Sequence, residues 1–439
     1  MSQMNSTEVC IFWFRRDLRS NDNTGLFHAL RSGWPVVPVF IFDTNILQEL
    51  PSGDRRMPLI YEALQKLDDT FRKSGSGLVT IQGTPMEAFQ NLCQQYSVKA
   101  VYTNHDYEPY ARKRDSAIET FLKEQGISFH SFKDQVMFEK DEVLKPDGTP
   151  YTVFTPYSKK WKDAWQQVHW KNTDSENYLH HLLQVPDPPD LVPLATLGFH
   201  ARNNLPLPRL DASFLSRYHE TRDYPAIEGT THLSVSLRLG LLSIRHLLKT
   251  IQPINTKLFD ELIWREFYQS ILWHFPHVVH QSFKPDYDRI QWLNREEDLQ
   301  AWYEGRTGYP MVDAGMRELK ETGWMHNRVR MVCASFLCKH LLCDWRLGEA
   351  WFAACLLDYD LASNNGGWQW AAGCGVDAAP YFRIFNPTLQ ALKFDPERKY
   401  LLRYIPELDS LHYPNPIVEH EMARERCLSV YKKAIHSIP

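Results

Sequence analysis

The first 135 residues alternate between short strand-like runs and helix-length segments, and this alternation restricts the fold more than any other feature. Runs rich in β-branched or aromatic residues occur at 9–14, 36–42, 78–82, 100–103 and 127–132. The segments 23–31, 55–73, 85–96 and 107–124 between them have the length of helices. Strands that alternate with helices form right-handed βαβ units, so the pattern predicts a doubly wound, mostly parallel α/β sheet that ends near residue 135.

A sheet of this kind can bind a dinucleotide, but the glycine fingerprint for that function is missing. The nearest candidate, Gly75-Ser76-Gly77, has Thr80 where the third glycine belongs, and it precedes a strand instead of following one. The turn that holds a pyrophosphate is therefore absent. A dinucleotide bound to the sheet in the usual way is not expected.

The rest of the chain changes character twice. Residues 136–208 contain many prolines and little periodicity, which predicts a linker that crosses the surface, with one helix at 154–168. From residue 209 the apolar spacing is helical, and nine of the fourteen tryptophans fall between Trp264 and Trp370. We therefore predict an α/β domain at 1–135, a linker at 136–208 and an all-helical domain at 209–439. Its helices are expected at 242–251, 257–275, 299–304, 311–322, 327–343, 349–357 and 422–434.

Composition excludes several classes of protein. The 49 lysines and arginines are balanced by 53 acidic residues, which excludes a polybasic binder but allows an enzyme with a local basic patch for nucleic acid. The longest apolar run, 36–42, is too short for a membrane span, and the N-terminus lacks the order of a secretory signal, so we expect a cytoplasmic protein. The eight cysteines form no C-x-x-C pair, which favours reduced thiols and no metal site.

Two helical segments combine charge with aromatic rings. Within 257–275, the residues Glu261, Trp264, Arg265 and Tyr268 share one face, which predicts either the lining of a polar cavity or a salt bridge between helices with aromatic packing. In the segment 324–331, a helix beginning near residue 327 places an amide, a guanidinium and a thioether on one side while Arg328 leans away. That arrangement suits a flat, partly polar ring beside a phosphate, although a solvated helix end is the alternative. The residues on that side are Asn327, Arg330 and Met331.

The segment 358–370 holds the densest set of polar and aromatic residues. Acids, amides and two indoles surround the pair Gly366-Gly367. Two adjacent glycines predict a tight turn or a close approach to a ligand, because they remove side chains from the backbone. The polar groups are costly to bury unless something satisfies them, so the segment indicates a binding site more strongly than a simple turn between helices.

Six motifs together resemble the DNA photolyase/cryptochrome family over nearly the whole chain and in the same order. They lie at 13–19 (Trp-Phe-Arg-Arg-Asp-Leu-Arg) with Asp22-Asn23, 264–268, 308–310 with Asp313, 323–330, 364–370 and 377–387. Within the family, the chain is most similar to class I cyclobutane pyrimidine dimer photolyases. The resemblance implies an α/β antenna domain followed by a helical domain that binds FAD without a covalent bond.

The resemblance also implies the residues of the cofactor site. Asn364 takes the position that faces the reactive edge of the flavin, where plant-type cryptochromes carry aspartate, and this favours repair over signalling. Arg330 is expected to pair with Asp358 beside the ring. The full set implied for FAD is Tyr218, Thr230, Thr231, Leu233, Ser234, Ser236, Arg265, Asn327, Arg330, Asp358, Asp360 and Asn364.

A second set is implied for the damaged DNA. Indoles are expected to cover the pyrimidine faces, Glu261 to hydrogen-bond or protonate a base, and arginines to hold the flanking phosphates. The Asn327-Arg328 pair differs from the (6-4) photolyases, which carry a second histidine after the position of His326. The residues implied for the lesion and the rim are Arg222, Glu261, Trp264, Asn327, Arg328, Met331, Trp370 and Arg383.

Three tryptophans match the family's electron relay from the surface to the flavin, namely Trp292, Trp345 and Trp368. From the sequence alone they could equally be packed core residues.

An antenna chromophore is implied near Glu108, within 104–114, and methenyltetrahydrofolate, a deazaflavin, a second flavin or no chromophore remain open. The cysteine-lysine pair of some folate-binding relatives is not reproduced at 278–281.

The implied activity is that of a carbon-carbon lyase acting on DNA. Light excites FADH⁻, which donates an electron to a pyrimidine dimer flipped out of single- or double-stranded DNA, and the cyclobutane ring splits. A monomer without an obligate protein partner or membrane association is expected. The alternatives are a cryptochrome-type blue-light photoreceptor, a (6-4) photolyase, or a helical flavoprotein that uses a nicotinamide.

Overall fold

The computed structural model describes residues 7–169, 173–200 and 207–436. By contact the chain forms two compact units, and neither is a continuous stretch of sequence. The first contains Met1–Glu139, Trp165–Pro208 and His232–Thr250, and the second contains Lys140–Ala164, Arg209–Thr231 and Ile251–Pro439. This grouping reflects packing alone, so the functional boundaries 1–135, 136–208 and 209–439 stay a prediction.

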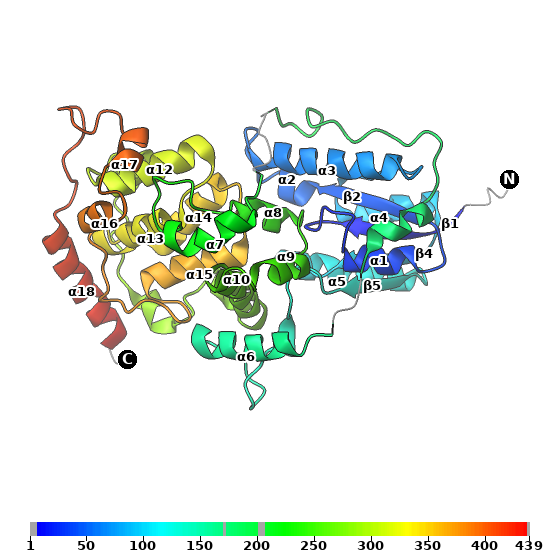
Figure 1. The fold of residues 1–439 in the computed structure, drawn as a ribbon, viewed down its shortest axis with the longest axis horizontal. Helices are drawn as coiled ribbons and strands as arrows, with labels where there is room; N and C mark the ends of the chain where they lie inside the picture. Colours follow the sequence, from blue (N-terminus) through cyan, green and yellow to red (C-terminus); the bar gives the residue numbers. More distant parts are fainter. Residues whose placement is uncertain (1–6, 170–172, 201–206, 437–439) are drawn as a thin grey trace. The chain divides into compact units, whose positions relative to one another are not determined.

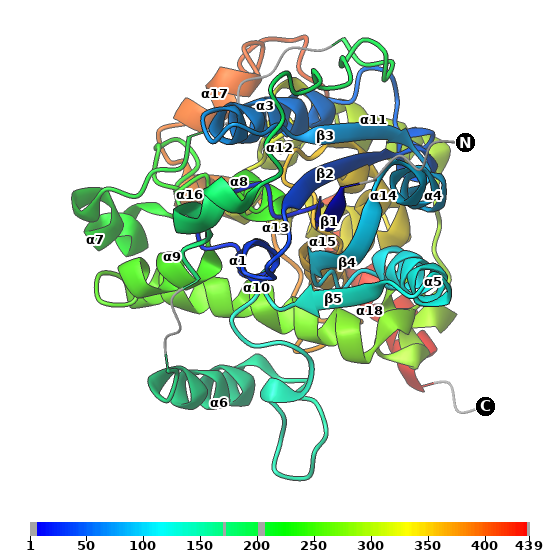
Figure 2. The same ribbon diagram turned by 90° about the vertical axis from the view of Figure 1, so that its right-hand side faces the viewer.

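The first unit is built on a five-stranded sheet in which every neighbouring pair of strands is parallel. The strands are β1 (Glu8–Phe14), β2 (Val36–Asp43), β3 (Val79–Gly83), β4 (Ser97–Asn104) and β5 (Ser128–Phe132). Their order across the sheet is β3-β2-β1-β4-β5, which Figure 2 shows almost face-on. The predicted doubly wound α/β sheet is confirmed, and all five strands lie within a few residues of their predicted positions.

Helices cover both faces of this sheet. Strand β2 is buried along its whole length and β1 along nearly all of it, as expected for central parallel strands. On one face, Phe89 of α4 packs against Trp13 of β1 in a cluster that also contains Leu122 of α5, and on the other, Phe71 of α3 packs against Phe14. The helical elements of this unit are α1 (Thr24–Leu30), α2 (Thr44–Leu47), α3 (Arg56–Arg72), α4 (Pro85–Gln95), α5 (Pro109–Glu124), η2 (Ser175–His181), α8 (Leu233–Leu239) and α9 (Ile244–Ile251).

A buried network of charges joins α9 to the sheet part of the first unit. Arg245 donates to Asp22 at 3.0 Å and to Asp134 at 2.9 Å, and Arg19 also pairs with Asp134 at 2.7 Å. Burial opposes ionisation of Asp134, but the charges of Arg19 and Arg245 hold its pKa below the usual value. Residues more than 200 positions apart are therefore needed to complete this unit.

The second unit is helical, which confirms the predicted all-α part of the fold. Its long central helix α10 (Thr256–His274) begins with Asn255, whose side chain accepts from the N–H of Leu258. The other helices are α6 (Phe154–Gln166), α7 (Ala212–Thr221), α11 (Glu296–Glu304), α12 (Pro310–Thr322), α13 (Asn327–Ser335), α14 (Trp345–Cys355), α15 (Leu361–Ala372), α16 (Pro387–Phe394), α17 (Lys399–Tyr404) and α18 (His420–His436). Short 3₁₀ turns are η1 (Lys140–Glu142), η3 (Pro276–Val279) and η4 (Pro285–Arg289). Helix α15 packs against α10, α13 and α14 (Figure 1).

Two sequence predictions for this unit are wrong. The pair Gly366-Gly367 does not form a turn but lies inside α15, a regular helix that is capped at its start by Asp360. The helix predicted at 327–343 changes type and ends earlier, because α13 passes at Phe336 into a π-helical turn, η5 (Phe336–His340), and residues 341–343 are not helical. A π-helical turn is a local adjustment that hydrophobic periodicity does not reveal.

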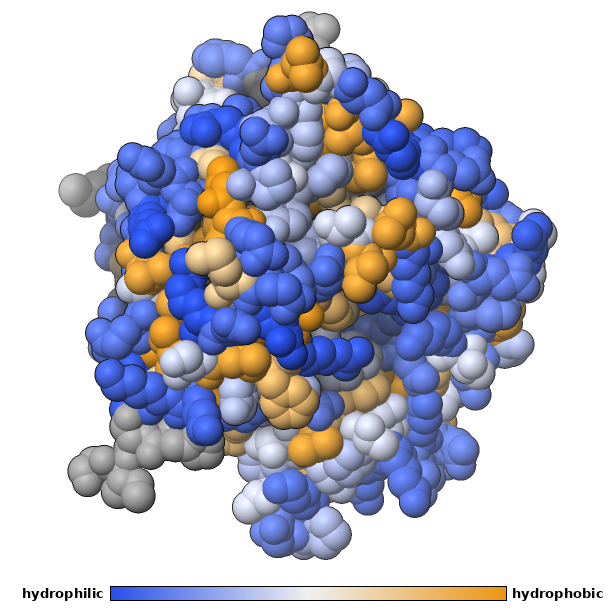
Figure 3. Space-filling view, turned by 90° about the vertical axis from the view of Figure 1, so that its left-hand side faces the viewer, coloured by the Kyte–Doolittle hydropathy of each residue, from blue (hydrophilic) through white to orange (hydrophobic). Residues whose placement is uncertain are grey.

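A large cluster of apolar and sulfur-containing side chains fills much of the interior of the second unit. Cys333, Cys338 and Cys343 are all buried in it as free thiols, in agreement with the sequence prediction. Among the described residues, no group of three or more potential ligands could hold a metal ion. On the face drawn in Figure 3, hydrophobic residues form small, separate areas among hydrophilic ones.

Candidate cofactor and substrate site

Helix α10 presents an aromatic and acidic face within the second unit. The indole of Trp264 stacks on the ring of Phe154 with centroids 3.8 Å apart and planes within 9°. Tyr268, one turn further along, lies 5.6 Å from Trp264. Trp264 and Arg265 remain half-buried, so this face is neither a closed core nor a solvated surface. The predicted combination of Glu261, Trp264 and Tyr268 on one side of the helix is therefore present.

Glu261 is fixed by two partners that come from α7 and its C-terminal end. The hydroxyl of Tyr218 donates to Glu261 Oε2 at 2.6 Å, and the guanidinium of Arg222 pairs with Oε1. Burial raises the pKa of the Tyr218 phenol, so it is a stable donor at neutral pH. Tyr218, which was assigned to the cofactor, thus contacts Glu261, which was assigned to the lesion.

Sequence reasoning missed an aspartate that joins two of the predicted arginines. Asp223 accepts from Arg328 at 2.9 Å and lies 3.7 Å from Arg222. Burial disfavours its charge, but the Arg328 hydrogen bond and the nearby charges of both arginines hold the pKa of Asp223 below its usual value. Its position next to Arg222 was the only signal in the sequence. The result is a pair of guanidiniums held at a defined place beside Glu261.

Helix α13 groups its side chains differently from the prediction. The Sδ atom of Met331 lies 4.0 Å from both Asn327 Nδ2 and Arg328 Nη1, so Arg328 does not lean away from Met331. Arg330 turns the other way, since it donates to the carbonyl of Met325 at 2.7 Å and to Asp358 Oδ2 at 2.9 Å. The predicted Arg330–Asp358 ion pair is present. Three polarisable or polar side chains therefore gather at the start of α13.

Two acidic residues form hydrogen bonds to α15: Asp360 at its start and Glu349 along its side. Asp360 caps the helix by accepting from the N–H and hydroxyl of Ser363, at 3.1 and 3.0 Å, and it also accepts from Gln269. Asn364 donates through Nδ2 to the carboxylate of Glu349 at 2.8 Å and to its carbonyl at 3.1 Å. Burial raises the pKa of Glu349. Because Glu349 takes the amide N–H groups, Asn364 presents its carbonyl oxygen as an acceptor.

The geometry leaves room for a flat ligand beside α15. A Cβ atom added at Gly367 would meet nothing within 4 Å, and Gly367 lies one helical turn from Asn364 on the same side. Asp358 Oδ1 is buried and has no hydrogen-bond partner within the described part of the chain. An open helix face with an amide acceptor and an unsatisfied carboxylate oxygen fits a cofactor with a planar ring and N–H donors. The residues present therefore fit FAD.

The cofactor residues and the lesion residues come from helices that touch. A Cβ atom added at Gly366 would lie 2.2 Å from the ring of Tyr268, so this glycine lets α15 approach α10 closely. The helix that carries Asn364 therefore packs directly against the helix that carries Glu261 and Trp264. Positions on opposite sides of the unit would have contradicted the sequence interpretation.

The predicted hydroxyl-bearing loop is divided between the two units. Thr230 and Thr231 belong to the second unit, and the carbonyl of the buried Thr231 accepts from the N–H of Arg209 at 2.9 Å. Leu233, Ser234 and Ser236 lie on α8 of the first unit, where Leu233 and Ser236 are buried. Their shared role in binding phosphate stays a prediction.

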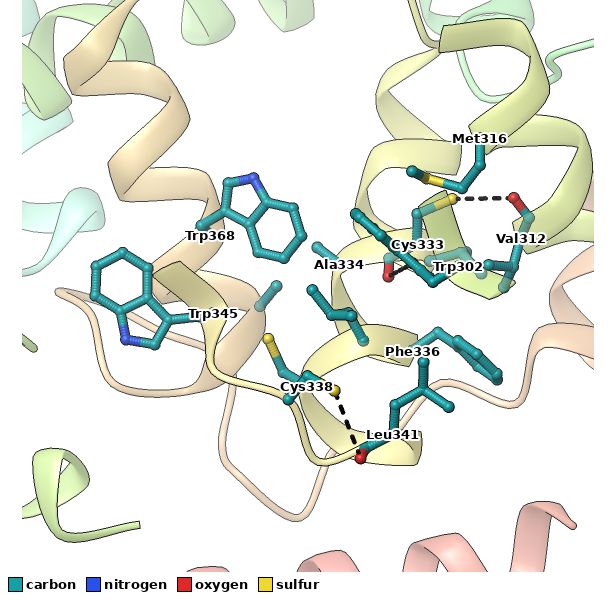
Figure 4. Packing of buried hydrophobic residues seen from close by; sticks show 14 of the residues in the cluster. Trp302, Val312, Met316, Cys333, Ala334, Phe336, Cys338, Leu341, Trp345 and Trp368 are labelled. Carbon is teal, nitrogen blue, oxygen red and sulfur yellow. Dashed lines mark hydrogen bonds between the residues drawn. The ribbon is translucent and has the colours of Figure 1, made fainter. Parts of the chain in front are cut away.

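The remaining predicted residues differ in exposure. Trp370 on α15 is half-buried against the core of the second unit, whereas Arg383 is exposed and its carbonyl accepts from the buried Lys339 at 2.8 Å. Trp345 and Trp368 are almost fully buried in the same cluster (Figure 4), and Trp292 is half-buried at its margin. Burial of the first two agrees with either an electron relay or simple packing.

The carboxyl edge of the sheet in the first unit carries the predicted antenna residue. The strand order reverses between β1 and β4, and ligands of open α/β sheets bind outside such a reversal. Glu108, which follows β4, accepts from Arg16 at 2.6 Å and from Arg238 at 3.2 Å. The site is thus polar and charged, although nothing in its geometry selects one chromophore.

Known protein families match most of this chain. The family model described as DNA photolyase matches residues 10–176, and the model described as FAD binding domain of DNA photolyase matches residues 258–412. A deoxyribodipyrimidine photo-lyase of Synechococcus is 36% identical over 96% of both chains. No helix among the described residues is long and apolar enough to cross a bilayer.

Solved structures show the same relationship. A class III photolyase from Agrobacterium tumefaciens superposes with a TM-score of 0.86 and 33% identity, covering 99% of each chain. An archaeal photolyase from Sulfolobus tokodaii, solved with two FAD molecules, gives a TM-score of 0.81 and 34% identity over 97% of this chain and all of that one. The chain belongs to the DNA photolyase family, and residues 258–412 are its FAD-binding domain.

Proposed function

We propose that this chain repairs cyclobutane pyrimidine dimers in DNA in a light-driven reaction with bound FAD. The contact of Tyr268 with Gly366 supports the proposal most, because it joins the helix of Glu261 and Trp264 to the helix of Asn364. When bound in its reduced form, FAD supplies the electron that light transfers to the dimer. The protein's part is to hold the lesion beside the ring, exclude water and position polar groups.

The residues beside α10 are suited to an extruded pyrimidine pair. Photolyases are among the enzymes that take a base out of the stack, and damaged bases cost less to extrude. The half-buried indoles of Trp264 and Trp370 can stack on the bases. Glu261, fixed by Tyr218 and Arg222, can accept hydrogen bonds from base N–H groups.

The arginine pair offers a contact to the DNA backbone. Asp223 accepts a hydrogen bond from Arg328 and lies close to Arg222. Because a guanidinium has five N–H donors, both arginines keep donors that can bind phosphates of the DNA backbone. Because the chain as a whole has a formal charge of −4, such local pairs must provide the attraction to DNA. Binding should therefore weaken as salt concentration rises.

The class of photolyase and the antenna are further parts of the proposal. We assign the chain to class I on its motifs, and Glu108 to the rim of an antenna site. Methenyltetrahydrofolate, a deazaflavin and a second flavin are the candidate chromophores. Extraction of the native protein followed by mass spectrometry identifies the chromophore, and a protein that releases one equivalent of FAD and nothing else would contradict the antenna assignment.

The activity is tested with purified holoprotein and two oligonucleotides, one with a cyclobutane dimer and one with a (6-4) photoproduct. We expect restoration of the cyclobutane dimer under near-UV or blue light, none in darkness, and none of the (6-4) product. A Glu261→Gln variant, which keeps the shape of the side chain, should repair more slowly.

Three results would contradict the proposal. A protein that purifies with flavin and photoreduces it but restores no dimer would be a cryptochrome-type photoreceptor. Repair of the (6-4) product alone would identify the other photolyase type. Bleaching of the flavin by a nicotinamide in darkness, without photorepair, would indicate a dark flavoenzyme.

A further inference from the structure

The indole of Trp264 has a partner that no sequence motif assigned to the site. Phe154, the first residue of α6, lies parallel to it, with centroids 3.8 Å apart and planes inclined by 9°. Phe267 meets the same indole nearly at a right angle, at 5.6 Å and 82°. Trp264 nevertheless stays half-buried. Because Phe154 covers one face of the indole, the exposed part lies at its edge or on its other face.

The ring of Phe154 belongs to the packed contact between α6 and α10. It also meets the ring of Phe267, which is fully buried, at 5.9 Å and 73°. Further along α6, the buried ring of Trp161 lies 5.6 Å from that of Phe259 on α10. Phe154 is therefore anchored from below by the core and does not lie loosely over the site.

A third segment fixes the backbone of Phe154. Its N–H donates to Oδ2 of Asp377 at 3.1 Å, across 223 positions of sequence. The first N–H groups of a helix have no partner within the helix, and a carboxylate at that end is favourable. Asp377 has a positive φ of 45°, in the left-handed region that aspartate and asparagine tolerate better than most residues. The chain thus adopts an uncommon backbone conformation at the residue whose carboxylate reaches α6.

We propose that Phe154 and Asp377 are positioning residues for recognition of the pyrimidine dimer. Asp377 fixes the start of α6, and the Phe154 ring placed there holds the Trp264 indole so that its other face meets the bases. The inference rests on the proposed function, because it takes Trp264 to stack on the lesion. It gives a residue of the predicted linker, 136–208, a part in substrate recognition.

The physical basis is the order of the stacking surface before DNA arrives. An indole that is already held in one orientation loses little conformational entropy when a base stacks on it. Without the Phe154 ring, Trp264 can adopt other orientations, and binding of the dimer has to select one of them. The loss of one aromatic pair corresponds to about a two- to tenfold loss of affinity for the dimer. Undamaged duplex keeps its bases stacked and does not use the indole, so its affinity should not change.

The test is a double-substitution cycle on purified holoprotein, read by fluorescence anisotropy in the dark. The quantity measured is the ratio of affinities for a duplex with one thymine dimer and for the undamaged duplex of the same sequence. The variants are Phe154→Leu, Trp264→Ala and the two together. Phe275→Leu is the matched control, because Phe275 is half-buried and contacts the ring of Phe283 at the other end of α10.

We expect Phe154→Leu to lower the affinity ratio about two- to tenfold and Phe275→Leu to leave it unchanged. Phe154→Tyr keeps the stacked ring and should match the wild type. In the Trp264→Ala background, Phe154→Leu should have no further effect, because it acts through the indole. In steady-state repair, the loss should fall on KM and not on the rate at saturating dimer.

Two substitutions of Asp377 separate its carboxylate from its backbone conformation. Asp377→Asn keeps an acceptor oxygen and tolerates the positive φ, so it should retain the wild-type ratio. Asp377→Gly accepts the same φ without strain but offers no acceptor to the Phe154 N–H. It should therefore lower the ratio about as far as Phe154→Leu does. If Phe154→Leu does not retain FAD, the comparison of Asp377→Gly with Asp377→Asn decides in its place.

The proposal is overturned if Phe154→Leu leaves the ratio unchanged, or lowers it equally with and without Trp264. Tighter binding of the dimer by Phe154→Leu would also overturn it, by showing that the ring occupies the place of a base. A wild type that prefers and repairs the dimer while its ratio ignores both Phe154 and Asp377 would remove this inference alone. A wild type with no preference for the dimer would remove the proposed function and the inference together.

Discussion

Glu318 on α12 is a buried carboxyl group whose ionisation should set the pH dependence of stability in the second unit. Its Oε2 accepts from the hydroxyl of Tyr400 at 2.7 Å and from the N–H of His326 at 3.4 Å. Burial raises the pKa of Glu318 from 4.5 to about 7, although these hydrogen bonds and the charge of Arg330 act in the opposite direction. The side chain thus links α12, α17 and the residue before α13.

Replacement of Glu318 by glutamine keeps the shape and an acceptor oxygen but removes the titration. Between pH 4.5 and about 7 the wild-type group is protonated in the folded chain and ionised in the unfolded chain. The folded state therefore holds more protons, and the free energy of unfolding falls as pH rises through this range. A difference of about 2.5 pH units at about 1.4 kcal/mol each gives about 3 kcal/mol.

The measurement is the difference in unfolding free energy between Glu318→Gln and wild type, with FAD saturating and the pH varied from 4.5 to 8.5. Burial lowers the pKa of His326 to about 4, so its own contribution rises with pH, but it is present in both proteins and cancels. We expect the variant to gain about 3 kcal/mol relative to wild type across this range. A difference that stays constant with pH would refute the assignment of a raised pKa to Glu318.

Three further predictions concern the site. Gly366→Ala should lower the free energy of unfolding by about 1–3 kcal/mol, because the added Cβ meets the Tyr268 ring. Gly367→Ala should leave the free energy of unfolding unchanged or raise it by up to about 1 kcal/mol, but it should weaken FAD binding. Both variants are compared by denaturation and by FAD titration, and equal effects of the two substitutions would contradict this prediction. Trp264→Ala should weaken binding of dimer-containing DNA by about 1–3 kcal/mol in fluorescence anisotropy while binding of undamaged DNA stays the same, and unchanged lesion affinity would remove Trp264 from the pocket. Asn364→Asp should lower the thermal unfolding temperature progressively as pH rises, because a second carboxylate then faces Glu349. Adding Glu349→Gln should restore the unfolding temperature. A loss of stability that does not depend on pH would show that the two side chains do not interact.

The central strands β1 and β2 could be predicted from sequence because they are buried on both faces and appear as nearly continuous apolar runs, and the alternation with helices located the more exposed edge strands β3 and β5. Helix α15 could not, since Gly366 and Gly367 lower helix propensity and amides favour turns. Tertiary packing overrides that preference, because Gly366 admits Tyr268 and Asp360 caps the start. The π-helical turn after α13 likewise has no sequence signal.

The site was predictable as a set of residue types but not as a set of contacts. The motifs located Trp264 and Asn364, but the stacking of Phe154 on Trp264 joins residues 110 positions apart, and no local pattern reports it. The same holds for Glu349, which orients Asn364 from a neighbouring helix. Periodicity predicts which side chains share a face, whereas the partner of that face depends on the folded chain.

The charges that Arg245 shares with Asp22 and Asp134 have a consequence for biosynthesis. During translation the sheet strands leave the ribosome first, but Asp22 and Asp134 lack their full set of counter-charges until α9 has also emerged. More than a hundred residues are added between β5 and that moment. A nascent chain that pauses before Arg245 would leave Asp22 and Asp134 with only part of their counter-charges, so the first unit can be completed only after α9 has been made.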